Sequence, residues 1–203
     1  MILYGIIILI TTGLTIGLNI LFHPGNEPFY YYIYWTFIFL AGALIVDSLT
    51  ALIIRRCFPE KFVLKKRRIY TTSMNEMKFY RSIKINKWKD KVPELGGFTD
   101  FHKNKFDNPN SSEYVLRFII EARYGALIHI WSCPLSFLIL LLDYRIYLGT
   151  TNFIFLTIGL PVAIVNAILI LLPAFILKNN LYRLDNIYES NLRREQMEQE
   201  QNA

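Results

Sequence analysis

Four long stretches of this chain carry almost no charge, and they constrain its fold more than any other feature. Residues 1–22, 124–142 and 146–177 contain no Asp, Glu, Lys or Arg, and residues 28–54 contain only Asp47. A helix that crosses a bilayer needs about 20 mostly apolar residues, and each stretch is long enough. The sequence therefore predicts four transmembrane helices, at about 2–22, 29–54, 124–142 and 152–177.

The composition supports this interpretation. Hydrophobic residues make up 53% of the 203 residues and charged residues only 19%, whereas soluble domains carry about 25% charged residues. This excludes an ordinary cytosolic enzyme, a secreted disulfide scaffold and a disordered tail protein. The first stretch lacks a basic start and a small-residue cleavage site, so we expect a retained anchor and not a signal peptide.

The positive charge is concentrated in one connection. Residues 55–124 contain 17 of the 22 Lys and Arg residues and eight Asp and Glu residues, a formal charge of +9. The connections 23–28 and 143–151 contain one basic residue, Arg145. Because basic residues collect on the cytoplasmic side of membrane proteins, we expect residues 55–124 and both termini in the cytoplasm of a bacterial cell. Topology and anionic headgroups account for this charge, so we expect no nucleic-acid partner.

The predicted fold class is an all-α integral membrane protein. Its regions are a transmembrane hairpin at 1–54, a basic cytoplasmic segment at 55–123, a second hairpin at 124–178 and a cytoplasmic tail at 179–203. They follow from the uncharged stretches and the charge asymmetry.

Two further helices and a frayed tail are expected around the membrane spans. Apolar residues recur at helical spacing in 75–88 and predict one amphipathic helix in the headgroup plane. A long helix should occupy 113–142, with Ser111 or Ser112 as its N-cap. The Glu- and Gln-rich residues after about 190 are poor in apolar side chains and predict a frayed, exposed tail.

Three polar side chains inside the apolar stretches are candidates for function, because such groups are costly in a membrane. They are Asp47, His129 and Asn166. Asp47 precedes Arg55 by eight residues and His129 follows Arg123 by six, which is about 12 Å and about 9 Å along a helix. An Asp47–His129 contact is therefore possible, as a structural hydrogen bond or as part of an active site.

His129 has two charged neighbours on the same predicted helix. Glu121 lies eight residues earlier, so its side chain projects about 80° from that of His129. A neutral histidine acts as a general base on a hydroxyl, and a carboxylate can orient it. Arg123 is suited to an anionic headgroup or an oxyanion. The alternative for Glu121 and Arg123 is that both reach the membrane interface and form an ion pair on the helix surface. Composition alone favours this alternative.

Other catalytic signatures are weak or missing in the sequence. His102 and Asp107 match the H-x4-D spacing of glycerolipid acyltransferases. However, that motif requires a sizeable α/β domain, and the basic connection of about 70 residues is too short to build one. The sequence has no glycine-rich phosphate loop, no G-x-S-x-G and no metal-ligand cluster, so no metal is expected.

Four blocks between residues 59 and 129 occur in a fixed order. They are Pro59-Glu60-Lys61-Phe62; Glu76 with Tyr80; Ile85-Asn86-Lys87-Trp88-Lys89-Asp90 with Pro93-Glu94; and Phe118-Ile119-Ile120-Glu121-Ala122-Arg123 with Ala126-Leu127-Ile128-His129. With these blocks, roughly residues 57–184 resemble the bacterial glycosyl-4,4'-diaponeurosporenoate acyltransferase family.

This resemblance implies a membrane acyltransferase that esterifies a hydroxyl of a glycosylated lipid, such as a glycosyl carotenoid of staphyloxanthin-type synthesis, with a fatty acyl group. His129 would be the catalytic base and Glu121 its partner, with Asp47 in support. No cofactor is expected, because the acyl donor is a co-substrate; acyl-coenzyme A, acyl-carrier protein and a phospholipid all fit the sequence. The partners would be membrane lipids and a lipid-linked sugar.

Substrate contacts would come from Arg123 and from the run Lys87, Trp88, Lys89 and Asp90. The alternative is a non-catalytic membrane adaptor or lipid-binding subunit. Such a protein needs only the charge and shape of the basic segment, and not His129.

Overall fold

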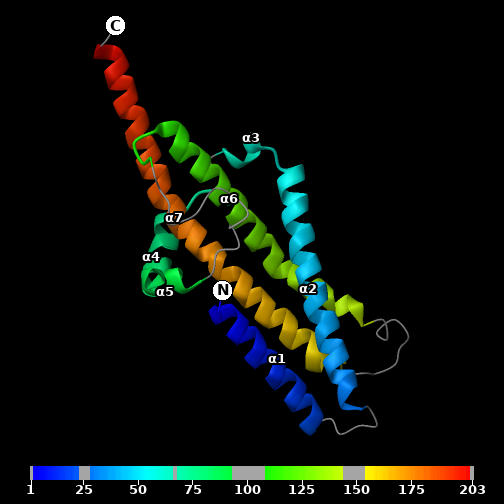
Figure 1. The fold of residues 1–203 in the computed structure, drawn as a ribbon. Helices are drawn as coiled ribbons and strands as arrows, with labels where there is room; N and C mark the ends of the chain where they lie inside the picture. The colour runs from blue at the N-terminus through cyan, green and yellow to red at the C-terminus, as the bar shows by residue number, and fades with distance from the viewer. Residues whose placement is uncertain (1, 23–27, 66–67, 93–107, 144–153, 202–203) are drawn as a thin grey trace. The chain divides into compact units, whose positions relative to one another are not determined.

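The computed structural model describes residues 2–22, 28–65, 68–92, 108–143 and 154–201 (Figure 1). Over these ranges the chain is helical and has no β-strand, which confirms the all-α prediction. The elements, in order, are α1 (Ile2–Phe22), α2 (Phe29–Cys57), α3 (Glu60–Val63), α4 (Met74–Ser82), α5 (Ile85–Trp88), the 3₁₀-helix η1 (Lys89–Lys91), α6 (Ser112–Leu135), the 3₁₀-helix η3 (Ser136–Leu142), the π-helix η5 (Phe155–Gly159) and α7 (Leu160–Gln201).

Four helical segments in the described ranges are long and apolar enough to cross a membrane, as predicted. They are α1, α2, α6 continued by η3, and η5 continued by α7. Prolines mark the irregular parts of these segments. Pro134 lies inside α6 and removes one backbone donor, and the helix tightens to a 3₁₀ conformation from Ser136 onward. These helices are compatible with a membrane protein.

The chain divides into two compact units, which are described separately. Unit 1 comprises Met1–Ile53 and Ile128–Leu172, and unit 2 comprises Ile54–Leu127 and Pro173–Ala203. The helices α2, α6 and α7 each contribute residues to both units.

The core of unit 1 is aromatic and aliphatic, with Trp35 and Phe39 from α2 packed in one cluster with Ile139 and Ile158. Gly159 allows a close approach within this core. A Cβ at that position would lie 2.9 Å from two ring carbons of Phe39, so a larger residue there would force the core apart.

A hydrogen bond from α1 repairs a defect that proline creates in unit 1. Pro161 has no N–H, so the carbonyl of Thr157, four residues earlier, loses its usual helical donor. The side-chain amide of Asn19 donates to that carbonyl at 3.0 Å. Asn19 is itself buried. The contact therefore fastens α1 to η5 and satisfies a partly buried backbone oxygen.

The core of unit 2 joins α6 to the second half of α7. Val115, Ile119 and Ala122 on one side of α6 cluster with Leu181 of α7. The hydroxyl of Ser111 accepts a hydrogen bond from the N–H of Tyr114 at 3.3 Å, which confirms a serine N-cap at the start of α6.

The prediction of a frayed tail after residue 190 is wrong, because α7 continues as a helix to Gln201. The carboxylate of Glu195 accepts from both the backbone N–H and the hydroxyl of Ser112, at 3.3 and 2.8 Å. Asn191 donates to the carbonyl of Pro109 at 2.8 Å. These polar contacts hold the last part of α7 against the start of α6.

The prediction of one amphipathic helix over 75–88 is also wrong. The helix α4 ends at Ser82, whose hydroxyl donates back to the carbonyl of Phe79 at 2.7 Å. Lys84 then adopts a left-handed conformation with φ of 52°, and α5 begins at Ile85. The aromatic rings of Phe79 and Tyr80 lie 5.7 and 5.9 Å from the ring of Phe175 in α7. Part of the apolar face of α4 is therefore covered by the protein itself.

Candidate functional site

Arg123 is buried in unit 2 and holds three segments together. Its guanidinium donates from Nη1 to the carbonyls of Val63 and Leu64, at 3.1 and 3.3 Å, and from Nη2 to Oδ1 of Asp185, at 2.9 Å. The residue is 5% exposed. Arg123 thus joins the end of α3 to α6 and α7, and it does not snorkel to a surface as its place in the sequence suggested.

Lys178 forms a second buried cationic centre in unit 2, which the sequence analysis missed. It is 4% exposed. Its ammonium donates to the carbonyl of Thr71, lies 3.4 Å from Oε1 of Glu76, and lies equally close to two more carbonyls, those of Arg68 and Ile69. The only sequence signal is its position directly after the last apolar stretch, where a lysine normally reaches toward the membrane surface.

The Lys178 centre also orders the start of α4. Glu76 accepts from the N–H of Ser73 at 2.6 Å, and Ser73 accepts from the N–H of Glu76 at 3.2 Å, which forms a capping box. Partial burial opposes ionisation of Glu76, but the Ser73 hydrogen bonds and the Lys178 charge outweigh it and lower the pKa of its carboxyl below 4.5. Burial and the Glu76 charge raise the pKa of Tyr80 to about 12, so its phenol stays neutral.

The lowered pKa of Glu76 predicts an acid-sensitive element in unit 2. Its contribution to the free energy of unfolding is complete above pH 4.5 and declines as the pH falls through the folded-state pKa. Glu76→Gln should therefore flatten the decline of the unfolding temperature between neutral pH and pH 3.5, measured in detergent. The matched control is Glu200→Gln, at an exposed position near the end of α7. An identical acid decline in wild type and Glu76→Gln would contradict this role.

The residues with a predicted substrate role on α5 and η1 stay together as sequence neighbours. Lys87 and Asp90 are exposed, whereas Trp88 and Lys89 are half-buried. The indole N–H of Trp88 donates to the carbonyl of Ile83 at 3.0 Å, and so it holds α5 against the end of α4. The accessible members of this run are therefore Lys87 and Asp90.

Glu121 has a basic partner in unit 2. Its Oε2 accepts from Arg55 at 2.9 Å, and the Arg55 guanidinium also lies 5.7 Å from the ring centre of Tyr124. Glu121 and Arg123 lie two residues apart on α6, but they bind different partners. A role for Glu121 beside His129 stays a prediction.

The intramembrane residues of unit 1 form a polar network around Asn166. Its amide nitrogen donates to Oδ2 of Asp47 at 3.2 Å and to the hydroxyl of Ser136 at 3.1 Å. The second oxygen of Asp47 is buried and has no hydrogen-bond partner among the described residues. The structure thus joins two of the predicted polar residues, Asp47 and Asn166.

His129 lies on the part of α6 that belongs to unit 1, and its side chain is half-buried. The described residues show no hydrogen bond to its imidazole, from Asp47 or from any other side chain. Within these ranges no hydrogen bond therefore ties the ring to a structural role.

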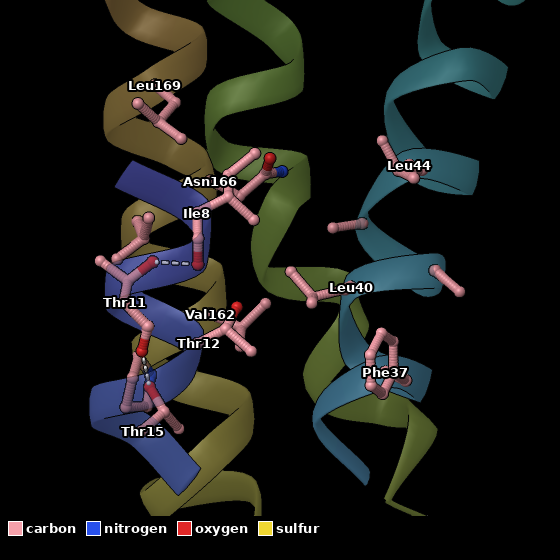
Figure 2. Close-up of a pocket in the computed structure, with 14 residues that line it drawn as sticks. Ile8, Thr11, Thr12, Thr15, Phe37, Leu40, Leu44, Val162, Asn166 and Leu169 are labelled. Carbon is pink, nitrogen blue, oxygen red and sulfur yellow. Dashed lines mark hydrogen bonds between the residues drawn. The ribbon is translucent and has the colours of Figure 1, made fainter. Parts of the chain in front are cut away.

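A cavity of about 370 Å³ opens in unit 1 between α1, α2 and α7, and Asn166 lies on its wall (Figure 2). The facing side chains include Thr11 and Thr12 from α1 and Leu40 from α2. Such a volume lies at the lower end of the range for small-molecule sites. Within the described ranges, no group of three or more His, Cys, Asp or Glu side chains is arranged to hold a metal ion.

Residues of both units match a known protein family. A family model described as glycosyl-4,4'-diaponeurosporenoate acyltransferase matches residues 60–190, which is more than half of the chain. This chain is a member of the glycosyl-4,4'-diaponeurosporenoate acyltransferase family. No curated protein matches it. No solved structure matches it either.

The match to the acyltransferase family covers some parts of the site and not others. It includes Arg123, His129 and Lys178, together with the α5 run. It leaves out α1 and all of α2, including Asp47. Two walls of the cavity therefore come from outside the matched region, and the third, α7, comes from within it.

Proposed function

We propose that this protein is a membrane-bound acyltransferase that esterifies a hydroxyl of a glycosylated lipid, of the glycosyl-carotenoid kind, with a fatty acyl group. The family match over residues 60–190 carries this proposal. The four apolar helices support it, because the acceptor of such a reaction is a lipid and would reach the enzyme through the bilayer.

His129 is the proposed general base. Its imidazole would take the proton from the sugar hydroxyl while that oxygen attacks the acyl carbonyl carbon, which forms the new C–O bond. The bond from the carbonyl carbon to the donor carrier then breaks, and the carrier leaves with the proton. Glu121 would stabilise the protonated imidazole, and Arg55 would hold the carboxylate of Glu121 in place.

The proposed substrate contacts differ in how available they are. Lys87 and Asp90 are exposed and suit a polar headgroup or an anionic carrier. Arg123 and Trp88 make internal hydrogen bonds, so we assign them to positioning the surrounding segments. The acyl donor is a co-substrate such as acyl-coenzyme A or acyl-carrier protein, and no further cofactor is proposed.

The reaction can be tested by expressing the full chain in cells that make a glycosylated carotenoid but no acylated form of it. An ester product, detected by mass spectrometry and lost on mild alkaline hydrolysis, would support the proposal. No ester from membranes that contain the protein would contradict it.

The rival function is a non-catalytic adaptor that binds anionic lipid or a partner. One observation favours it: Lys61 and Lys65 flank the exposed ring of Phe62, with their ammonium groups 5.9 and 4.9 Å from the ring centre. An adaptor should lose function when Lys65, Lys66, Arg67 and Arg68 are neutralised and should tolerate His129→Ala. The enzyme should show the reverse in the same assay.

We also propose a multi-pass protein of the bacterial cell membrane with both termini and residues 55–124 in the cytoplasm. The excess of Lys and Arg in that connection supports this orientation. A cysteine introduced at Asn104 should react with a membrane-impermeant reagent only after the cells are opened. Labelling from outside intact cells would show that the opposite orientation is correct.

A further inference from the structure

The cavity in unit 1 is lined almost entirely by hydrocarbon. Two of its three threonines use their hydroxyls in hydrogen bonds within their own helix. Thr11 donates to the carbonyls of Ile7 and Ile8, at 2.7 and 3.1 Å, and Thr15 donates to that of Thr11 at 2.8 Å. Figure 2 shows the bonds to Ile8 and Thr11. The amide nitrogen of Asn166 is already engaged by two other side chains. Few donors are left for a sugar or a headgroup, so the cavity favours an apolar occupant.

The size of the cavity favours one flexible chain. A cavity of about 150 Å³ binds benzene, which has six carbon atoms, so by proportion about 370 Å³ suits roughly 15 carbon atoms. A whole phospholipid has two such chains and a headgroup, and a carotenoid is a longer and rigid polyene. The observed volume therefore matches a single fatty acyl chain.

Small residues create this space. On α2, Ala41 and Ala43 line the cavity, and on α1 Thr12 lines it opposite them. Larger side chains at Ala41 or Thr12 would occupy the volume directly. Ala41 is exposed and Thr12 is half-buried, and neither belongs to the buried core cluster of unit 1, so a larger side chain there need not displace a packed core.

We propose that the cavity between α1, α2 and α7 binds the fatty acyl chain of the donor, and that Ala41 and Thr12 set the length of chain that is transferred. This inference rests on the proposed acyl transfer for its donor assignment. The binding of an acyl chain in the cavity stands independently, on the volume and the lining.

The first experiment measures binding without catalysis. The full chain in phospholipid nanodiscs is labelled with a photoreactive fatty acid of about 15 carbons, and the labelled peptides are mapped. Labelling should fall on α1, α2 and α7, and Ala41→Phe and Thr12→Phe should each reduce it about fivefold or more, because overpacking a filled space is unfavourable.

Matched controls carry the same change on the same helices at positions that do not line the cavity. They are Ile45→Phe on α2 and Leu9→Phe on α1, both strongly exposed. Their labelling should equal that of the wild type. Labelling spread over all lipid-facing helices, or an equal loss in the controls, would overturn the acyl-chain site.

The second experiment measures the acyl chains in the ester product. Ala41→Phe and Thr12→Phe should shift the product toward chains shorter by several carbon atoms, while both controls keep the wild-type distribution. If labelling falls but the product distribution is unchanged, the cavity holds a bilayer lipid tail and the donor assignment is wrong. If the wild type labels as expected but makes no ester, the proposed function fails and the acyl-chain site stands.

Discussion

His129→Gln should lower the rate of acyl transfer roughly 10²–10⁴-fold, the range usual for loss of a general base. Glutamine keeps approximate size and hydrogen-bonding capacity but cannot take the proton from the sugar hydroxyl. His129 has no structural hydrogen bond in the described ranges, so the unfolding temperature and the membrane yield should change little. The measurement is initial rate of ester formation at equal protein in the membrane.

Cys133→Ser is the matched control, because Cys133 lies one turn further along α6 and is also half-buried. Its rate should stay close to that of the wild type. If His129→Gln retains near-normal acyl transfer, His129 is a packing residue and another group must act as the base. A parallel fall in rate and unfolding temperature would likewise assign it to structure.

Arg123→Met should be the most destabilising change in unit 2. It removes the donors to Val63, Leu64 and Asp185 and leaves the Asp185 carboxylate without this partner. Breaking a buried ion pair by removing one member costs about 3 kcal/mol at the lower end of the usual range, which applies here because Asp185 is partly exposed. The expected result is a clear fall in the unfolding temperature in detergent.

Arg123→Lys tests whether geometry matters as well as charge. A lysine is a point charge and cannot reproduce a guanidinium fork that reaches three acceptors, so it should restore only part of the lost stability. The control is Arg193→Met, at an exposed position on α7, which should be nearly neutral. Equal stability of Arg123→Met and Arg193→Met would contradict the structural role of Arg123.

Local features of the chain were predictable because they depend on neighbouring residues. The four apolar helices follow from contiguous hydrophobic residues, and the N-cap at Ser111 follows from a serine beside a helical pattern. The resemblance to the acyltransferase family also rests on short contiguous blocks, and the match over residues 60–190 confirms it. The H-x4-D pair at His102 and Asp107 lies outside the described residues.

The errors came from contacts between distant segments. The helix predicted over 75–88 breaks at the left-handed residue Lys84, and the rings of Phe79 and Tyr80 before the break pack on Phe175 in α7. The tail after 190 is a helix because Asn191 and Glu195 bind groups more than 80 residues earlier. Neither partner is visible in the local pattern on which a prediction from periodicity depends.

The sequence by itself determined the helical class, the number of apolar spans and the family, since hydropathy and short motifs are properties of adjacent residues. Only the tertiary structure decided which polar groups are buried and what they bind. Arg123 and Lys178 read as surface residues at the edge of apolar stretches, yet both are buried among carbonyls and carboxylates from segments about 60 to 110 residues away. A buried charge is stable only with such partners, and folding, rather than local sequence, brings them together.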